Sequence, residues 1–160
     1  MTASEQMTAK DVLDALRWHH RSAALVPEVV IVDDYVDWNA DNPDAGKFTL
    51  LEPQTRRIDA LMFDTLERTT IEIKVSKADA GRESWRKVHP WRKVVHRYVY
   101  AVPAGLIDQP PVYGCGLWWV HPNGRVEVVR KTAINKTPEP LPQRVVQALA
   151  YRAAGQAVPA

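Results

Sequence analysis

Two acids and a lysine lie on neighbouring segments that are otherwise typical of buried strands. Asp59 lies inside the apolar run IDALMF, and Glu72 and Lys74 alternate with β-branched residues in TIEIKV. Side chains alternate along a strand, so Glu72 and Lys74 share one face, and Asp59 shares a face with Leu61 and Phe63. A solvated face with a mild Glu–Lys pairing is the ordinary alternative, but a carboxylate grouped with Leu and Phe argues against it.

The turn TLER predicts a hairpin that brings Asp59 close to Glu72 and Lys74. Two carboxylates can hold a hard cation such as Mg²⁺ or Mn²⁺, with the backbone carbonyl of Ile73 as a further ligand. A neighbouring lysine can orient a water molecule or stabilise negative charge that develops during its attack. This chemistry is that of metal-dependent phosphodiester hydrolysis.

The spacing of Asp59, twelve further residues and then Glu72-Ile73-Lys74 resembles the PD-(D/E)xK nuclease superfamily, with Ile58 in place of its proline. The stretches IEIKVSKAD and WRKVHPWRKVVHRYVYAVP are similar to its MmcB-like branch, over roughly residues 10–107. This resemblance implies a restriction-endonuclease-like α/β core of order αβββαβ. It also implies a Mg²⁺- or Mn²⁺-dependent deoxyribonuclease that acts in DNA repair or recombination, or in phage or host DNA processing.

The superfamily often adds an acid from its first helix to the metal site. Asp14, Asp11 and, at the first strand, Glu28 are candidates for this role, and the choice among them stays open. The Q-x-x-x-Y pattern of the RecB type does not follow Lys74, which argues against processive exonuclease action.

A basic segment over residues 82–97 has one acid, Glu83. Bases that neutralise phosphates beside aromatic rings that stack on nucleobases are typical of a nucleic-acid surface. We expect at least one of its tryptophans, Trp85 and Trp91, to face the core instead. The expected DNA contacts are Arg82, Arg86, Lys87, Trp91, Arg92, Lys93 and Arg97.

The elements that must position these residues follow from periodicity and turn signals. We expect one domain over residues 1–160, with a nuclease-like core of about 8–107 and a C-terminal hairpin and helix over about 112–155. The predicted helices span about 8–24, a region from Ser76 interrupted at Gly81 and Pro90, and 141–155. The predicted strands span 28–36, 57–64, 69–75, 97–103 and the two arms of a hairpin around HPNG, with a long loop over 37–55.

Charge and composition indicate which partner and which cellular compartment to expect. The net charge of +2 divides into −7 over residues 1–67 and +9 over residues 68–160, which favours a polyanionic partner for one surface. A single cysteine and the lack of an apolar leader or spanning run predict a cytoplasmic protein. The pair Trp118–Trp119 is expected to place one ring in the core and one outside, where a homodimer contact stays open. A non-catalytic DNA-binding or assembly protein with this fold, and a nuclease that acts on RNA, remain alternatives.

Overall fold

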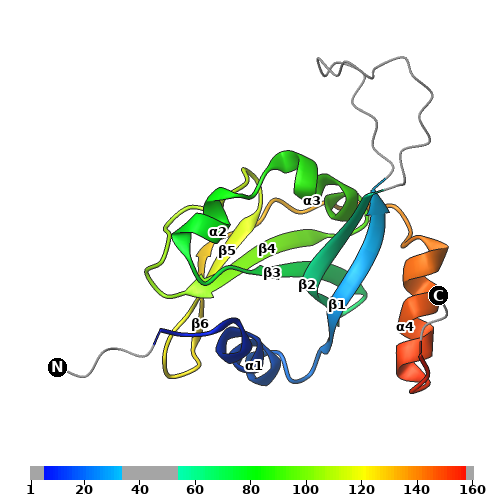
Figure 1. Ribbon diagram of the computed structural model, residues 1–160, viewed down its shortest axis with the longest axis horizontal. Coiled ribbons are helices and arrows are strands. Elements are labelled where there is room, and N and C mark those ends of the chain that lie inside the picture. The colour runs from blue at the N-terminus through cyan, green and yellow to red at the C-terminus, as the bar shows by residue number, and fades with distance from the viewer. Residues whose placement is uncertain (1–5, 34–53, 158–160) are drawn as a thin grey trace, which may run out of the picture.

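A computed structural model describes residues 6–33 and 54–157, so the predicted loop over 37–55 lies almost entirely outside the described residues. The order of elements follows the sequence-based expectation (Figure 1). The elements are α1 (Ala9–His19), β1 (Ala24–Asp33), β2 (Gln54–Asp64), β3 (Glu67–Ile73), α2 (Lys77–Gly81), α3 (Trp85–Arg92), β4 (Arg97–Pro103), β5 (Gly116–Val120), β6 (Val126–Arg130) and α4 (Gln143–Ala153).

The described strands form one mixed sheet in the order β1-β2-β3-β4-β5-β6. Strands β1, β2 and β3 form an antiparallel meander, β4 runs parallel to β3, β5 runs parallel to β4, and β6 returns antiparallel. Helices α2 and α3 provide the crossover that a parallel β3–β4 pair requires. The predicted α/β class, with a mixed sheet flanked by helices, is therefore confirmed.

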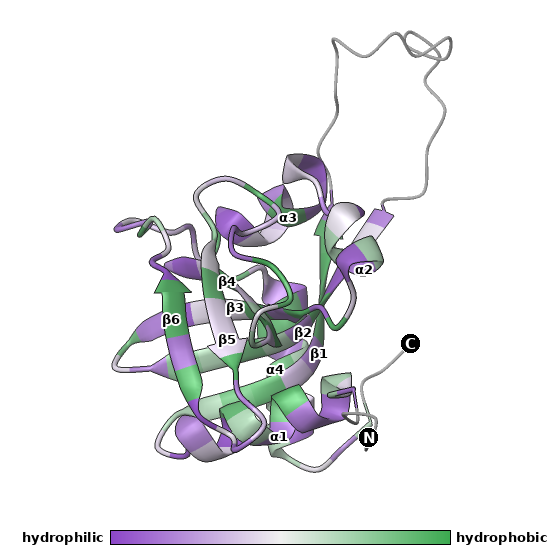
Figure 2. Ribbon diagram, turned by 90° about the vertical axis from the view of Figure 1, so that its left-hand side faces the viewer, coloured by the Kyte–Doolittle hydropathy of each residue, from purple (hydrophilic) through white to green (hydrophobic). Residues whose placement is uncertain are grey.

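The sheet is covered on both faces, and each covering forms its own core (Figures 1 and 2). Helix α1 buries Val12 and Leu16 against one face, which includes Ile71 of β3. Helix α3 buries Val88 and Trp91 against the other face. Because Glu72 alternates with Ile71 along β3, its side chain lies on the face covered by α3.

Local capping explains where the first two helices begin. The Thr8 hydroxyl and the Asp11 carboxylate form a reciprocal capping box at the start of α1, and the Ser76 hydroxyl accepts a hydrogen bond from the Asp79 amide at the start of α2. Helix α1 ends earlier than expected, since the chain enters β1 at Ala24.

The regular alternation of side chains between the two faces of the sheet is broken at Glu28 in β1 and near Asp59 in β2. Val26 and Val29 belong to the same core cluster, although regular alternation would place them on opposite faces. The break occurs at Glu28, which has a left-handed φ of 52° and no partner in the β1–β2 register. Arg152 of α4 donates hydrogen bonds to the carbonyls of Pro27 and Glu28 and so holds the distorted strand.

The same break in alternation is present in β2, where Ile58 and Leu61 lie in the same core cluster. Regular alternation therefore does not decide whether Asp59 shares a face with Leu61 and Phe63. Asp59 occupies the point at which the strand rotates, and its side chain is directed toward β3.

Trp91 was expected to contact DNA, and this prediction is wrong. Its ring is completely buried, and its indole N–H donates to the Arg56 carbonyl at 3.0 Å. Trp85, the other tryptophan of α3, is half exposed. The expected interruption at Pro90 is also wrong, because Pro90 lies inside α3, two residues before its end.

The rings of Trp118 and Trp119 both lie against the protein rather than one inside and one outside. Trp118 stacks on His20 and packs with the α1 core, whereas Trp119 packs with the other core and donates to the Ile107 carbonyl. This pair therefore provides no argument for a dimer. Within the described ranges, no helix combines the length and the apolar character needed to cross a bilayer.

Burial predicts different energetic roles for the two tryptophans of α3. Trp91→Ala should lower the free energy of unfolding by about 3–5 kcal/mol, because it removes a filled core volume and leaves the Arg56 carbonyl unpaired. Trp85→Ala on the same helix is the control and should cost about 1 kcal/mol or less. Urea titration followed by circular dichroism measures both values. Equal losses would contradict the assignment of Trp91 to the core.

Candidate active site

The candidate site begins where β2 and β3 separate. Their antiparallel register runs from Asp64–Glu67 to Ala60–Ile71 and stops there. At the next position the Asp59 carboxylate accepts a hydrogen bond from the Ile73 amide at 2.7 Å, which replaces the missing ladder bond. The N–H and C=O of one strand residue point to the same side, so the Ile73 carbonyl is also directed toward the gap beside Asp59.

Glu72 has a largely buried carboxylate, since its side chain is 14% exposed. Its Oε2 atom is buried and has no hydrogen-bond partner among the described residues. Burial, followed by the negative charge of Asp59, raises the pKa of Glu72 to about 8. A buried oxygen without a partner is costly, which makes Glu72 a strong candidate for an additional ligand.

Lys74 lies between two carboxylates at unequal distances. Its Nζ atom is 2.8 Å from Oε1 of Glu83 and 3.7 Å from Oε1 of Glu72. Burial alone would lower the pKa of Lys74, but the hydrogen bond to Glu83 and the neighbouring carboxylate charges outweigh burial and raise it. Lys74 is therefore a cation at neutral pH.

Glu83 completes the cluster, and its role was not predicted from the sequence. Its side chain is 7% exposed, and its second oxygen accepts a hydrogen bond from the Tyr100 hydroxyl at 3.1 Å. The sequence feature that could have indicated this role is that Glu83 is the single acid in the basic segment 82–97. Tyr100, which is fully buried on β4, carried no comparable signal.

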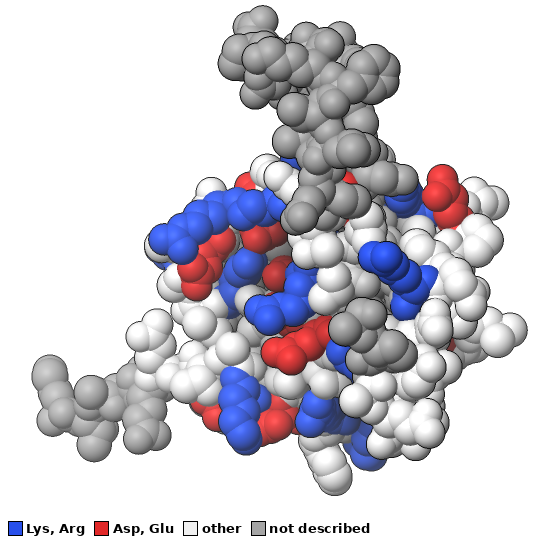
Figure 3. All heavy atoms as spheres, turned by 45° about the vertical axis from the view of Figure 1, so that its right-hand side comes forward, with Lys and Arg blue, Asp and Glu red and all other residues white. Residues whose placement is uncertain are grey.

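A cavity of about 250 Å³ opens beside the cluster, between the first half of β2 and α3. Glu72 and Glu83 line it together with Arg57 and Lys87, both of which are exposed residues. Figure 3 shows that Lys and Arg side chains lie around acidic ones on the face it presents, rather than in a uniformly basic patch. The cavity therefore joins carboxylates to cations that could contact a phosphate backbone.

The donor atoms fit a hard divalent cation. Asp59, Glu72 and the Ile73 carbonyl offer oxygen ligands, and the partnerless Oε2 of Glu72 is the strongest indication of a missing ligand. No three His, Cys, Asp or Glu side chains of the described residues form a ready-made metal site. The set therefore suits Mg²⁺ or Mn²⁺ held by few protein ligands, because these ions usually keep water or substrate oxygens in their shell.

The structure does not bring the proposed additional acids to this cluster. Asp14 is exposed on α1, on the opposite face of the sheet, where it pairs with Lys10, and Asp11 caps the same helix. Glu28 lies between the paired positions Pro27–Ala60 and Val29–Ile58 and lines a different cavity, between β1 and α4. An acid from the α2–α3 connection, Glu83, lies beside Lys74 instead.

The basic segment divides into residues with different surroundings. Lys87 lines the cavity, whereas Arg82 pairs with Asp79 and Arg86 approaches the buried Asp33. Lys93 follows α3 as its C-cap and is partly buried.

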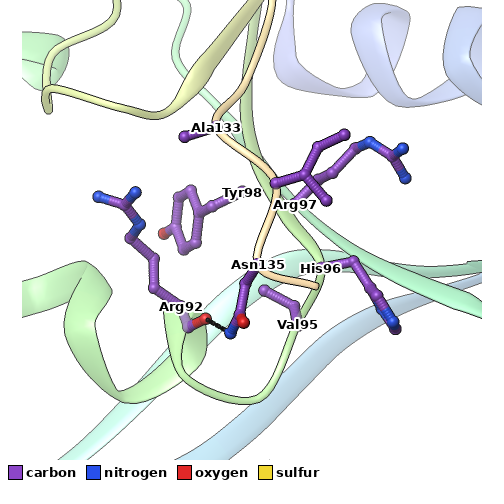
Figure 4. A pocket seen from close by; sticks show the side chains of 8 residues that line it. Arg92, Val95, His96, Arg97, Tyr98, Ala133 and Asn135 are labelled. Carbon is purple, nitrogen blue, oxygen red and sulfur yellow. Dashed lines mark hydrogen bonds between the residues drawn. The ribbon is translucent and has the colours of Figure 1, made fainter. Parts of the chain in front are cut away.

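The last two arginines of the segment face away from each other (Figure 4). Arg92 donates to the Tyr113 carbonyl, and Arg97 pairs with Glu67. They border a second, smaller cavity of about 150 Å³ on either side of Tyr98. The segment 82–97 therefore does not form one continuous surface. Arg57, which was not predicted from the sequence, lines the larger cavity together with Glu72 and Glu83, whereas Arg97 lines the smaller one.

The fold occurs in another protein of known structure. A protein of unknown function from Silicibacter pomeroyi matches with a TM-score of 0.52 and 16% sequence identity, over 97% of this chain and 90% of that chain. At this identity the similarity shows a shared fold alone. No protein-family model matches the chain, and no curated protein sequence matches it.

The raised pKa of Glu72 predicts a pH-dependent cost of folding. The folded protein keeps this proton up to about pH 8, whereas the unfolded carboxyl loses it near pH 4.5. The folded state therefore binds more protons between these values, and stability falls as pH rises, by at most about 1.4 kcal/mol per pH unit. Glu72→Gln cannot ionise and should become progressively more stable than the parent from pH 5 to pH 8.

Thermal unfolding at several pH values tests this expectation in metal-free buffer. Glu139→Gln makes the same chemical change at an exposed position and serves as the control. A constant difference between Glu72→Gln and the parent across this pH range would contradict the buried state of Glu72.

Proposed function

We propose that this protein is a metal-dependent nuclease that hydrolyses phosphodiester bonds in DNA. One observation carries the proposal: the separation of β2 and β3 brings Asp59 against the Ile73 amide, and a buried oxygen of Glu72 has no hydrogen-bond partner within residues 6–33 and 54–157. Lys74 lies in the same cluster. This combination of oxygen ligands and a cation suits metal-assisted phosphodiester hydrolysis.

The order of elements supports a restriction-endonuclease-like core. Helix α1, the meander β1–β3, the α2–α3 crossover and the parallel strand β4 follow the order αβββαβ that the resemblance implies. Asp59 lies on the second strand of this core and Glu72 on the third, with Lys74 directly after that strand, in agreement with the D-x(n)-E-x-K pattern. Strands β5 and β6 and helix α4 extend it.

Each residue has a chemical role in this proposal. Asp59, Glu72 and the Ile73 carbonyl hold the cation, and the Asp59–Ile73 bond fixes the orientation of both ligands. A bound Mg²⁺ or Mn²⁺ would supply positive charge at the scissile phosphate and acidify water. Lys74 stays protonated, so it donates hydrogen bonds to the attacking water or to a phosphate oxygen and is not a general base.

Substrate contacts come from both sides of the cavity. Arg57 on β2 and Lys87 on α3 line it with Glu72 and can neutralise the phosphates on either side of the scissile bond. DNA repair or recombination in the cytoplasm, or DNA processing during phage infection, is the setting that we propose for this activity.

Cleavage assays test the proposed reaction. Asp59→Asn and Glu72→Gln should each lower cleavage of plasmid, single-stranded and branched DNA by at least about 100-fold in Mg²⁺ or Mn²⁺, and excess EDTA should abolish it. Asp64→Asn, at the exposed end of the same strand, is the control and should cut as the parent does. Cutting that survives EDTA or either substitution would exclude this site. Binding of DNA without cutting would favour the non-catalytic alternative, and cutting of RNA alone would redirect the proposal to RNA.

Salt dependence of binding tests the cavity cations. Arg57→Gln and Lys87→Gln should each reduce the slope of log affinity against log salt by about 0.9 for duplex DNA, because each removes one phosphate contact. Fluorescence anisotropy in EDTA measures affinity without cleavage. Lys10→Gln makes the same charge change on α1, which covers the other face of the sheet, and should leave the slope unchanged. Equal slopes for all three variants and the parent would exclude Arg57 and Lys87 as phosphate contacts.

A further inference from the structure

The position of Lys74 between Glu72 and Glu83 is asymmetric. The contact of 2.8 Å between Lys74 Nζ and Glu83 is a charge-assisted hydrogen bond, whereas 3.7 Å to Glu72 is beyond hydrogen-bond distance. Glu72 lies near the end of β3 and Lys74 directly follows its last residue, so these two side chains, two positions apart, would be natural partners. Glu83, from another element, is the residue that binds the lysine instead.

Glu83 is fixed on both its backbone and its side chain. Its amide donates to the Ala80 carbonyl at the end of α2, and the next residue, Ser84, caps α3. Its Oε2 atom accepts the hydrogen bond from Tyr100, whose ring is fully buried. The carboxylate that binds Lys74 is therefore held in place by two helices and by β4.

The consequence of this arrangement is seen at Glu72. In the part of the chain that the structure describes, its Oε2 atom is buried without a partner, although an ammonium group lies close to the other oxygen of the same carboxylate. A buried carboxylate gains strongly from a nearby cation, so Lys74 would move to Glu72 if nothing else bound it.

We propose that Glu83 is a positioning residue for Lys74, which it holds away from Glu72 so that the buried oxygen of Glu72 remains free for a divalent cation. This inference rests on the proposed metal-dependent function, and it adds a residue that the D-x(n)-E-x-K pattern does not include. Tyr100 supports it by orienting Glu83.

The negative charge of Glu83 could by itself strengthen cation binding, without any effect on the position of Lys74. With all four side chains ionised, Asp59, Glu72, Glu83 and Lys74 carry a net charge of −2, and loss of Glu83 would weaken cation binding through charge alone. A positioning role requires Lys74, whereas a pure charge effect or direct ligation by Glu83 does not. A double-mutant cycle distinguishes the two.

Mn²⁺ affinity by calorimetry is the readout, measured for the parent, Glu83→Gln, Lys74→Met and the double variant. Glu83→Gln should weaken Mn²⁺ binding about tenfold or more, because Lys74 then pairs with Glu72. In the Lys74→Met background the same substitution should cost less than about threefold. Equal losses in both backgrounds, or no loss in either, would overturn the positioning role.

Tyr100→Phe is a second variant that keeps every charge. It should weaken Mn²⁺ binding by about two- to fivefold with Lys74 present and have no effect with Lys74→Met. Circular dichroism confirms the fold of each protein. Binding by Tyr100→Phe equal to that of the parent would contradict the role of the Tyr100–Glu83 bond.

Failure of this inference differs from failure of the proposed function. If the parent binds Mn²⁺, Asp59→Asn abolishes binding and the Glu83 cycle shows no coupling, then the positioning role alone is excluded. If the parent binds no Mn²⁺ at millimolar concentration, both proposals are excluded. Coupling in a parent that cuts no nucleic acid supports the positioning role and excludes the nuclease.

Discussion

The hydrogen bond from the Ile73 amide to the Asp59 carboxylate is the interaction on which the site depends. Where β2 and β3 separate, an interior amide would lose its ladder partner, and a buried N–H without a partner is costly. A carboxylate on the diverging strand satisfies this amide at 2.7 Å. The sheet can therefore open at one end without a penalty to its backbone, and the acid that closes the hydrogen bond lies beside Glu72.

The separation of β2 and β3 also places several charged side chains in a largely buried position. Glu72, Lys74 and Glu83 have side chains that are 14%, 15% and 7% exposed. Burial of two acids with one lysine opposes folding, and Glu72 shows this cost through its raised pKa. The two cores on either face of the sheet supply the compensating apolar burial, and the caps of α1 and α3 fix the helices that cover them. A cluster of buried titratable side chains with shifted pKa values is typical of a functional site.

The sequence predicts that Asp59 and Glu72 lie close together, since a tight turn at Thr65-Leu66 sets the hairpin register. The alternation of side chains along β3 then determines the face on which Glu72 lies. The position of Glu83 could not be predicted, because it depends on how the α2–α3 crossover lies over the sheet. Trp91 was misassigned since a tryptophan among basic residues has the same sequence pattern whether its ring stacks on a base or fills a core. The break in alternation at Glu28 and near Asp59 was missed because it involves Arg152, 124 residues away from Glu28.

The contact of Arg152 with β1 has a consequence for how this protein behaves among its own copies. Among the described strands β1 is an edge of the sheet, and an edge strand with free carbonyls is a template for pairing with another chain. Arg152 occupies the carbonyls of Pro27 and Glu28, and the left-handed residue at Glu28 interrupts the flat geometry that a second strand would need. The C-terminal helix thus protects the edge against aggregation, and the same contact stiffens the strand that lies beside Asp59.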